Sequence, residues 1–178
     1  MIHAREQFLA RIREIEPHRL VFLDETGSHI AMTRTHGRAP RGERLIGRVP
    51  RNRGAVTTVL GAIARRGLTA LMTVEGGTSR DVFMTFVNDH LGPSLRPGDV
   101  VVMDNLGAHH ATGVRDAIEA TGASVLYMPP YSPDLNPIEL CWSKFKDLLR
   151  TLGGRTRREL VENIELVADF ITPSDARG

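Results

Sequence analysis

The sequence predicts an α/β domain in which helices cover the faces of a mixed sheet. Three observations lead to this fold class. Two runs of consecutive apolar residues, at 20–23 and 100–103, are typical of strands buried on both faces. Several strand-like segments come early in the chain, and helical and strand patterns alternate after them. The length of 178 residues, 41% of them hydrophobic, suits one domain with a sizeable core.

The first half of the chain is predicted to supply most of the sheet. Its expected elements are a linker or short helix over residues 5–15 and strands over 20–24, 28–35, 55–64 and 68–74. The first strand is expected to end at Asp24, because Gly27 permits a turn soon after it. Arg66-Gly67 is expected to form the hairpin turn between the last two strands.

The second half is predicted to alternate helices with strands. Thr78 is a favoured N-cap residue with Asp81 at the capping-box position, and an apolar helix face follows at 82–91. Thr156 and Glu159 form the same pattern at the start of the last helix. The other expected elements are strands over 100–103 and 124–128 and helices over 114–122 and 137–152.

The composition excludes several classes of protein. A single cysteine, Cys141, excludes an internal disulfide and a cysteine-based zinc site. No apolar run approaches the roughly 20 residues that span a bilayer, and the first residues do not form a secretory signal. We therefore expect a cytoplasmic protein without a membrane partner.

Positive charge is concentrated in one segment. Residues 34–53 hold seven arginines against one acid, so this segment carries +6, whereas the whole chain carries only +2. Six glycines and prolines from Gly37 to Gly54 favour an irregular loop there. A dense basic strip indicates a polyanionic partner such as nucleic acid. The alternative is a solvated loop in an arginine-rich chain, since the sequence has only two lysines.

Two of the predicted buried strands lead into aspartates, Asp24 and Asp104. If these strands are parallel neighbours, their carboxylates emerge at the same sheet edge, roughly 5 Å apart. Carboxylates that close repel each other unless one is protonated or a cation lies between them. Oxygen ligands without a Cys or His cluster suit Mg²⁺ or Mn²⁺. The alternative is that each aspartate only serves a turn or a cap.

A third acid, Glu139, falls in the first turn of a predicted helix. Asn136 is a favoured N-cap residue and Pro137 a favoured first helical residue. The preceding segment at 129–136 contains three prolines, which stiffen it and can hold the helix start at a fixed place. Glu139 can therefore face the strand ends. The alternative is that it only closes a capping box with Asn136.

Three stretches resemble the acidic motifs of mariner-superfamily DDE transposases. They are Asp24-Glu25-Thr26-Gly27, Asp104-Asn105 with His109, and Tyr131-Ser132-Pro133-Asp134-Leu135-Asn136-Pro137-Ile138-Glu139. The 34 residues between Asp104 and Glu139, and the arginine-rich stretch at 37–44, are similar to the bacterial insertion-sequence-630 family. The resemblance extends from about residue 18 over nearly the whole chain, and its most specific part is the motif at 131–139.

This resemblance implies an RNase H-like fold, with a five-stranded mixed sheet in the order 3-2-1-4-5 and helices on both faces. Asp24 is then on the central first strand, Asp104 at the end of the fourth, and Glu139 on the helix after the fifth. The residue patterns give one strand too many before residue 75. Either the hairpin of 55–64 and 68–74 splits the third strand, or one of its strands is accessory.

The resemblance also implies two-metal phosphoryl transfer with Mg²⁺ or Mn²⁺. Asp24 is expected to bridge the two ions, and Asp104 and Glu139 each to hold one. The first reaction hydrolyses DNA at the transposon end. The freed 3′-OH then attacks target DNA, at a TA dinucleotide by analogy with the family.

Four further residues are expected near the three acids. Glu25 faces away from Asp24 along the strand, so it is expected to support the site from behind. Asn105 and His109 are expected to position a metal-bound water or the scissile phosphate, although His109 can equally be a residue at a helix start. Asn136 is expected first as a helix cap, with substrate positioning as its second role.

Other side chains are expected to contact DNA or to fill the core. Tyr131 either stacks on a DNA base or packs within its loop. Trp142 lies on the apolar stripe of its helix and is expected in the core. Contacts with the DNA backbone are expected from six arginines of the basic segment: Arg38, Arg41, Arg44, Arg48, Arg51 and Arg53.

The expected domain organisation is a linker or short leading helix at 1–18 and a catalytic domain at 19–178. Mariner-superfamily transposases also carry N-terminal helix-turn-helix modules, and 18 residues are too few for one. The chain is thus expected to be either the second product of a split reading frame or a truncated copy. The expected partners are transposon-end and target DNA, a second copy on DNA, and a separately encoded helix-turn-helix subunit, in association with the nucleoid.

Two other functions stay open at this point. The first is a catalytically silent transposase remnant that acts as a DNA-binding or dimerisation module, and the presence of all three acids argues against it. The second is an RNase H-like housekeeping nuclease, and the proline-rich motif at 131–139 argues against it.

Overall fold

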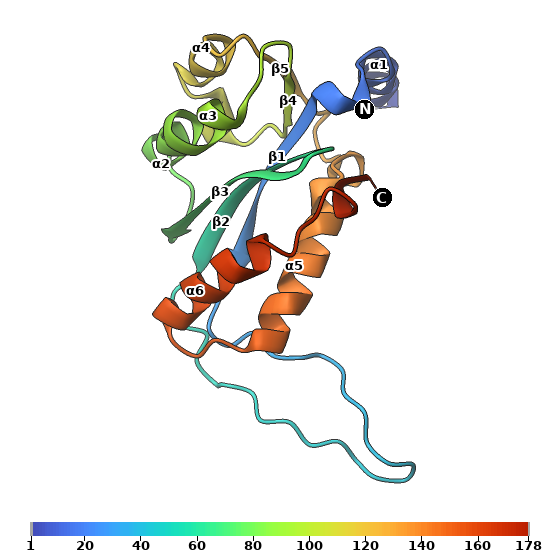
Figure 1. Ribbon diagram of the computed structural model, residues 1–178, viewed down its shortest axis with the longest axis vertical. Coiled ribbons are helices and arrows are strands. Elements are labelled where there is room, and N and C mark those ends of the chain that lie inside the picture. Colours follow the sequence, from blue (N-terminus) through green and yellow to red (C-terminus); the bar gives the residue numbers. More distant parts are fainter. Residues whose placement is uncertain (1, 178) are drawn as a thin grey trace.

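The computed structural model describes residues 2–177, and within them five strands form one mixed sheet (Figure 1). The strands are β1 (Leu20–Ser28), β2 (Thr57–Ala64), β3 (Gly67–Glu75), β4 (Val100–Met103) and β5 (Ser124–Tyr127). Their order is β3-β2-β1-β4-β5. β2 pairs antiparallel with β1 and β3, whereas β4 pairs parallel with β1 and β5. The predicted fold class and strand order are confirmed.

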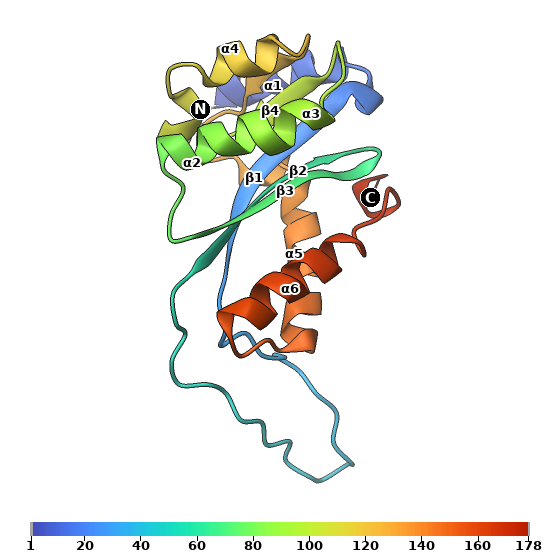
Figure 2. The same ribbon diagram turned by 60° about the vertical axis from the view of Figure 1, so that its left-hand side comes forward.

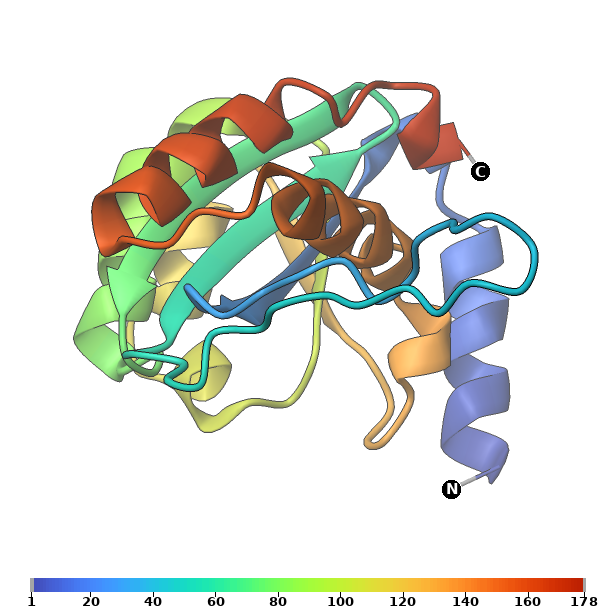
Figure 3. The same cartoon turned by 90° about the horizontal axis from the view of Figure 1, so that it is seen from below.

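Helices cover both faces of this sheet (Figures 2 and 3). The α-helices are α1 (Ile2–Arg13), α2 (Arg80–Thr85), α3 (Gly92–Ser94), α4 (Val114–Glu119), α5 (Ile138–Leu152) and α6 (Arg157–Ala168). Short 3₁₀ turns are η1 (Pro17–Arg19), η3 (Gly107–His110), η4 (Pro133–Leu135) and η5 (Asp175–Arg177), and a π-helical turn, η2 (Phe86–Leu91), continues α2. None of the described helices has the length and apolarity to cross a bilayer.

The two faces of the sheet have separate cores. Val21 and Leu23 of β1 pack on one face with Phe83, Phe86 and other apolar residues of α2, η2 and α4. On the opposite face, α5 and α6 cover β2. α1 covers β4 and β5 through Phe8. Because side chains alternate along a strand, even-numbered β1 residues face α5 and odd-numbered ones face α2.

β1 is longer than the sequence predicts, and this corrects two expectations. It does not end at Asp24, and Gly27 does not make a turn, because β1 pairs with β2 from Val21 through Ser28. Eight paired residues outweigh the local preference of one glycine. The surplus predicted strand was therefore 28–35, so the hairpin of β2 and β3 neither splits one strand nor adds an accessory one.

The segment after Ser28 leaves the sheet because other groups satisfy its polar backbone. Arg155 donates from Nη1 to the carbonyl oxygens of Ile30 and Met32, each at 3.0 Å. Met32 is buried in the cluster formed with α5 and α6. From there the chain forms a long loop that extends away from the body (Figures 1 and 2) and is exposed throughout 34–49. We call residues 33–56 the basic arm.

The helix starts give one confirmed prediction and one correction. Thr156 and Glu159 form the expected capping box of α6. At α2 the N-cap residue is Ser79 rather than Thr78, and the Ser79 hydroxyl accepts from Val82 N–H at 3.3 Å. Thr78 and Ser79 both carry a hydroxyl group that can cap a helix, and a local sequence pattern does not show which of the two does so.

A glycine sets how closely α5 approaches the sheet. Gly61 of β2 lies opposite Asp24 of β1, and the ring of Trp142 lies against Gly61. A Cβ atom at position 61 would come 2.5 Å from Cη2 of Trp142. Trp142 is buried, as predicted, and it lies one helical turn after Glu139. The contact between Gly61 and Trp142 therefore fixes the distance between the start of α5 and Asp24.

We predict that Gly61→Ala lowers the free energy of unfolding by about 1–3 kcal/mol, because the added methyl group overpacks the contact with Trp142. Urea unfolding measures this. Gly77→Ala is the matched control, since Gly77 has open space around its Cβ position and no positive φ. Adding Trp142→Phe to Gly61→Ala is expected to recover part of the loss. A Gly61→Ala variant as stable as the control contradicts the prediction.

Candidate active site

Asp24 and Asp104 lie in equivalent positions on neighbouring parallel strands. The pairing of β1 with β4 ends at Phe22 and Val102, and each aspartate follows two residues later. Residues two apart in a strand point to the same side of a sheet, so Asp24 faces the α5 side, while Asp104 lies just past the end of β4. Beyond this point β1 continues along β2 alone, which leaves Asp24 open on its β4 side. The ends of parallel strands where neighbours part are common sites for ligands.

Glu139 reaches this edge from the start of α5, and the predicted cap is wrong. The helix begins at Ile138 with Pro137 in the N-cap position, and no side chain caps it. Asn136 follows the 3₁₀ turn η4 in an extended conformation, and its Nδ2 donates to the Leu23 carbonyl at 3.4 Å. Since Asn136 does not cap the helix, the capping-box alternative for Glu139 is excluded.

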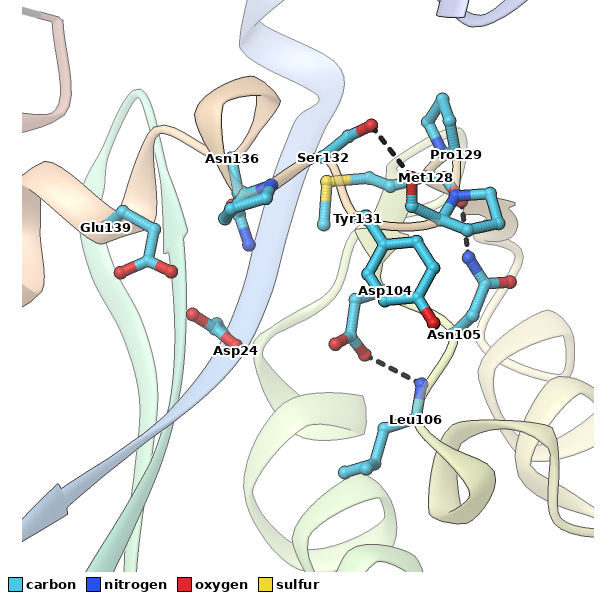
Figure 4. Close-up of a pocket in the computed structure, with 12 residues that line it drawn as sticks. Asp24, Asp104, Asn105, Leu106, Met128, Pro129, Tyr131, Ser132, Asn136 and Glu139 are labelled. Atoms are coloured by element: carbon cyan, nitrogen blue, oxygen red, sulfur yellow. Dashed lines mark hydrogen bonds between the residues drawn. The ribbon is translucent and has the colours of Figure 1, made fainter. Parts of the chain in front are cut away.

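The three acids line one pocket of about 410 Å³. Its other walls come from the chain after β4, which supplies Asn105 and Leu106, and from the segment between β5 and α5. We call that segment, residues 128–137, the proline loop. Figure 4 shows the carboxylates of Asp24 and Glu139 facing each other, with Asp104 on the other side of Asp24. The structure thus places the three acids that the sequence predicts around one pocket.

Asp24 holds its proton more tightly than an ordinary aspartate does. Burial, together with the charges of Glu139, Glu25 and Asp104, raises the pKa of Asp24 to about 7, against the lowering effect of the hydrogen bond from Glu25 N–H. The Asp24 carboxyl group is thus poorly solvated and lies close to other negative charges. A cation relieves both penalties, because it neutralises the charge where water cannot.

Asp104 has the opposite environment because a buried histidine holds it. Nδ1 of His109 lies 2.7 Å from Oδ1 of Asp104, and Nε2 lies 3.2 Å from Oε1 of Glu25. Burial lowers the pKa of His109, but the hydrogen bonds to Asp104 and Glu25 and their charges outweigh this and raise it to about 9. The hydrogen bond from His109 in turn lowers the pKa of Asp104, and Leu106 N–H donates to the same carboxylate at 2.9 Å.

Glu25 supports the site from the other face of the sheet. It follows Asp24 in β1 and therefore points to the opposite side, where it contacts His109. The ring of His109 also packs 4.3 Å from the ring of Phe83 on α2. His109 lies in η3 and not at the start of α4, so it is not a residue at a helix start.

Asn105 is tied to the end of β5. Its Nδ2 donates to the Met128 carbonyl at 2.6 Å, and its Oδ1 lies 3.2 Å from Nε2 of His110. His110 stacks on Tyr127 with ring centres 4.2 Å apart, and Tyr127 donates its hydroxyl to the His109 carbonyl. These contacts stabilise the turn that carries His109. The side chain of Asn105 is therefore hydrogen-bonded to protein groups in this structure.

Tyr131 stands at the rim of the pocket (Figure 4). It is 92% exposed, which rules out packing within its loop. Its φ of 54° lies in the left-handed region, which bulky residues rarely adopt. Backbone strain of this kind is often found where a side chain is held ready for a ligand. The neighbouring Ser132 is buried, and its hydroxyl donates to the Pro130 carbonyl.

The donor atoms of the pocket are oxygens, the type that a hard divalent cation prefers. Asp24, Asp104 and Glu139 offer carboxylate oxygens, and Oδ1 of Asn136 is buried without a hydrogen-bond partner among residues 2–177. Oxygen ligands of this kind suit Mg²⁺ or Mn²⁺. In the described part of the chain, no three acidic, histidine or cysteine side chains stand close enough to hold an ion together. The Asp104 carboxylate is instead engaged by His109 and Leu106.

The predicted DNA-contacting arginines lie away from this pocket. They are on the basic arm, where they are exposed, and none lines the pocket: Arg38, Arg41, Arg44, Arg48, Arg51 and Arg53. The arm also exposes Leu45, Ile46 and Val49. Arg5, which no sequence pattern indicates, contacts Ser132 and Asp134 of the proline loop. No local pattern signals a contact between residues so far apart.

An RNase H-like sheet with acids at the ends of parallel strands and on a following helix is the architecture of a nuclease of the DDE class. The family described as DDE superfamily endonuclease matches residues 19–160. The chain therefore belongs to the DDE superfamily endonucleases. No curated protein sequence matches it.

Solved structures of Mos1 transposase have the same fold. The pre-cleavage Mos1 transpososome matches with a TM-score of 0.75 and 18% identity, and the Mos1 mariner paired end complex with Mn with 0.76 and 20%. Each match covers 98% of this chain and 55% of the other, so the chain spans about half their length. The Mos1 catalytic domain with raltegravir and Mg gives 0.72 and 17%, covering 98% and 83%.

We predict that Asp24→Asn stabilises the metal-free protein at alkaline pH. The pKa of Asp24 rises from 3.8 to about 7 on folding, so stability from this group is present below pH 3.8 and is lost as the pH rises through 7. Asparagine carries no such charge. The melting temperature of the variant should therefore exceed that of the wild type at pH 8, and the gap should close toward pH 4.

The control is Asp89→Asn, whose side chain is exposed and outside the pocket. We expect its melting temperature to follow the wild type at every pH. Millimolar Mg²⁺ should raise the melting temperature of the wild type more than that of Asp24→Asn. A gap between Asp24→Asn and wild type that does not change with pH contradicts the environment described for Asp24.

Proposed function

We propose that this chain is the catalytic domain of a DNA transposase. It hydrolyses DNA at a transposon end and joins the freed 3′-OH to target DNA. The observation that carries the proposal is that Asp24, Asp104 and Glu139 line one pocket, which lies where β1 and β4 stop pairing. Family membership gives the reaction class, since DDE endonucleases cut DNA.

The three acids have distinct roles in this proposal. Two Mg²⁺ or Mn²⁺ ions, when bound, lower the pKa of the attacking water and stabilise the leaving 3′ oxygen. Asp24 lies between the other two acids (Figure 4) and would hold both ions. Asp104 and Glu139 would each hold one. His109, whose other ring nitrogen contacts Glu25, keeps Asp104 ionised and oriented, since the hydrogen bond from His109 lowers the pKa of Asp104.

DNA contacts are proposed for the rim and the basic arm. Tyr131 is exposed over the pocket, where it stacks on a base of the cleaved strand. The arginines of the arm contact phosphates, which makes binding depend on salt. The matched Mos1 structures include a paired end complex. By analogy we propose a homodimer on DNA, insertion at TA and membership of the insertion-sequence-630 branch.

The chain spans about half of the matched transpososome proteins. We propose that specific recognition of transposon ends requires a helix-turn-helix module, either in a separately encoded subunit or in a longer form of the chain. The domain described here then supplies cleavage and strand transfer, and its own DNA contacts are not specific for sequence.

We predict that Asp104→Asn and Glu139→Gln each reduce metal-dependent nicking of supercoiled plasmid by about 100-fold or more, because each substitution removes a charged ligand from the metal site. Nicking is measured in Mn²⁺ and in Mg²⁺, and circular dichroism shows whether the fold is kept. Asp89→Asn is the matched control and should nick like the wild type, because its exposed side chain lies outside the pocket.

Three outcomes contradict the proposal or narrow it. A wild-type protein that binds DNA but never cuts it, in either metal, is the silent remnant. A wild-type protein that cuts RNA–DNA hybrids and spares duplex DNA is a housekeeping nuclease. Nicking that survives Asp104→Asn in a purified, folded protein shows that the acids do not carry the chemistry.

We predict that replacing Arg41, Arg44 and Arg48 together by alanine weakens DNA binding and flattens its salt dependence. Each lost phosphate contact lowers the slope of log affinity against log salt by about 0.9. Fluorescence anisotropy with a labelled duplex at several salt concentrations measures the slope. Arg158→Ala is the control, because Arg158 is exposed on α6 and paired with Glu162. An unchanged slope in the triple variant contradicts a role for the arm in binding DNA.

A further inference from the structure

One arginine on α1 joins the N-terminal segment to the proline loop. Nη1 of Arg5 donates to Oγ of Ser132 at 2.9 Å and to Oδ1 of Asp134 at 3.0 Å, and Nη2 donates to Oδ2 of Asp134 at 2.5 Å. The guanidinium group thus donates hydrogen bonds to both carboxylate oxygens of Asp134 and to the hydroxyl of Ser132. Hydrogen bonds from Arg5 also hold the pKa of Asp134 below its usual value.

The helix that carries Arg5 is itself anchored. Phe8, one turn later, is 6% exposed and packs against Val102 of β4, Leu126 of β5 and Met128 of the proline loop. Figure 3 shows α1 running beside the segment between β5 and α5. Arg5 is therefore presented to the proline loop by a helix that is fixed on the sheet.

The proline loop is held on its inner side as well. Asn136 donates to the carbonyl of Leu23, the residue before Asp24. Ser132 is buried and donates to Pro130 within the loop. The proline loop is therefore held at two places: Arg5 binds its Ser132 and Asp134, and its Asn136 binds β1. Its last residue leads directly into α5, whose second residue is Glu139.

An isolated surface ion pair adds little to stability, since solvent screens it and both side chains lose freedom. The Arg5 contact is different in geometry, because it is bidentate and shares a third hydrogen bond with buried Ser132. The contribution of this contact is to hold the proline loop in a fixed position. A displacement of about 1 Å at a catalytic group can reduce the rate about 100-fold.

We propose that Arg5 is a positioning residue, which clamps Asp134 and Ser132 so that the proline loop holds Glu139 and Tyr131 in place at the active site. This inference rests on the proposed function. Arg5 precedes the region 19–160 that defines family membership, so membership assigns it no role. The segment that leads into the catalytic domain thereby contributes to the geometry of the catalytic pocket.

The test uses the full chain and nicking of supercoiled plasmid in Mn²⁺. The variants are Arg5→Ala, Arg5→Lys, Asp134→Asn and the charge swap of Arg5→Asp with Asp134→Arg. Arg13→Ala is the matched control, because Arg13 is an exposed arginine on the same helix. Each variant is assayed for kcat, for KM of the plasmid and for the Mn²⁺ concentration that gives half-maximal rate. Hydrogen exchange at 128–137 reports on the loop without any need for activity.

We expect Arg5→Ala and Asp134→Asn to lower kcat about tenfold and to raise the half-maximal Mn²⁺ concentration, with KM nearly unchanged. Arg5→Lys should recover only part of the rate, because a lysine cannot bind both carboxylate oxygens. The charge swap should recover more than either of its single substitutions. Exchange at 128–137 should rise in Arg5→Ala and not in Arg13→Ala.

The proposal is overturned if the wild type nicks DNA and Arg5→Ala matches it in kcat and in metal dependence. It is also overturned if the lost rate only follows the fraction of unfolded protein, with no change in exchange at 128–137. A wild type that never nicks DNA overturns the proposed function, and the positioning role falls with it. Exchange data then still show whether Arg5 holds the loop.

Discussion

The early end of the pairing between β1 and β4 is the constraint on which the candidate site depends. Pairing stops at Phe22 and Val102, while β1 continues along β2 to Ser28. The chain after β4 turns away at once, held by His109 and by Leu106 N–H on Asp104. From Asp24 onward, the edge of β1 that faces β4 is therefore unpaired. Asp24 is therefore rigid, because β2 supports its backbone, and accessible, because β4 no longer covers it.

The electrostatics of the site follow from the two faces of this strand. On the α5 side, burial and neighbouring charges raise the pKa of Asp24 to about 7. On the α2 side, buried His109, which also contacts Glu25, lowers the pKa of Asp104. Two adjacent residues of one strand thus serve one site from opposite sides. Asp104 is therefore kept ionised, whereas the charged form of Asp24 is stabilised by a bound cation, as expected for ligands of a divalent metal.

The third acid is placed by packing rather than by the sheet. Glu139 stands at the start of α5, and the contact of Trp142 with Gly61 fixes how closely that helix approaches β1. The proline loop supplies the other constraint, since Asn136 ties it to β1 and Arg5 ties it to α1. The site therefore draws on the N-terminal helix, the central strand and a helix near the C-terminus. Residues separated by more than 100 positions have to pack correctly before the acids converge.

The sequence by itself determined the fold class, the three acids and most helix and strand positions. Apolar periodicity and turn residues are local properties, and Asp24, Asp104 and Glu139 belong to short motifs that a single chain displays. Only the tertiary structure decided how far β1 runs, that 28–35 leaves the sheet, and that Asn136 binds the Leu23 carbonyl instead of capping α5. The same holds for Arg5 and for the pairing of Glu25 with His109. These features depend on partners distant in the chain, whose contacts outweigh local preference and leave no local signal.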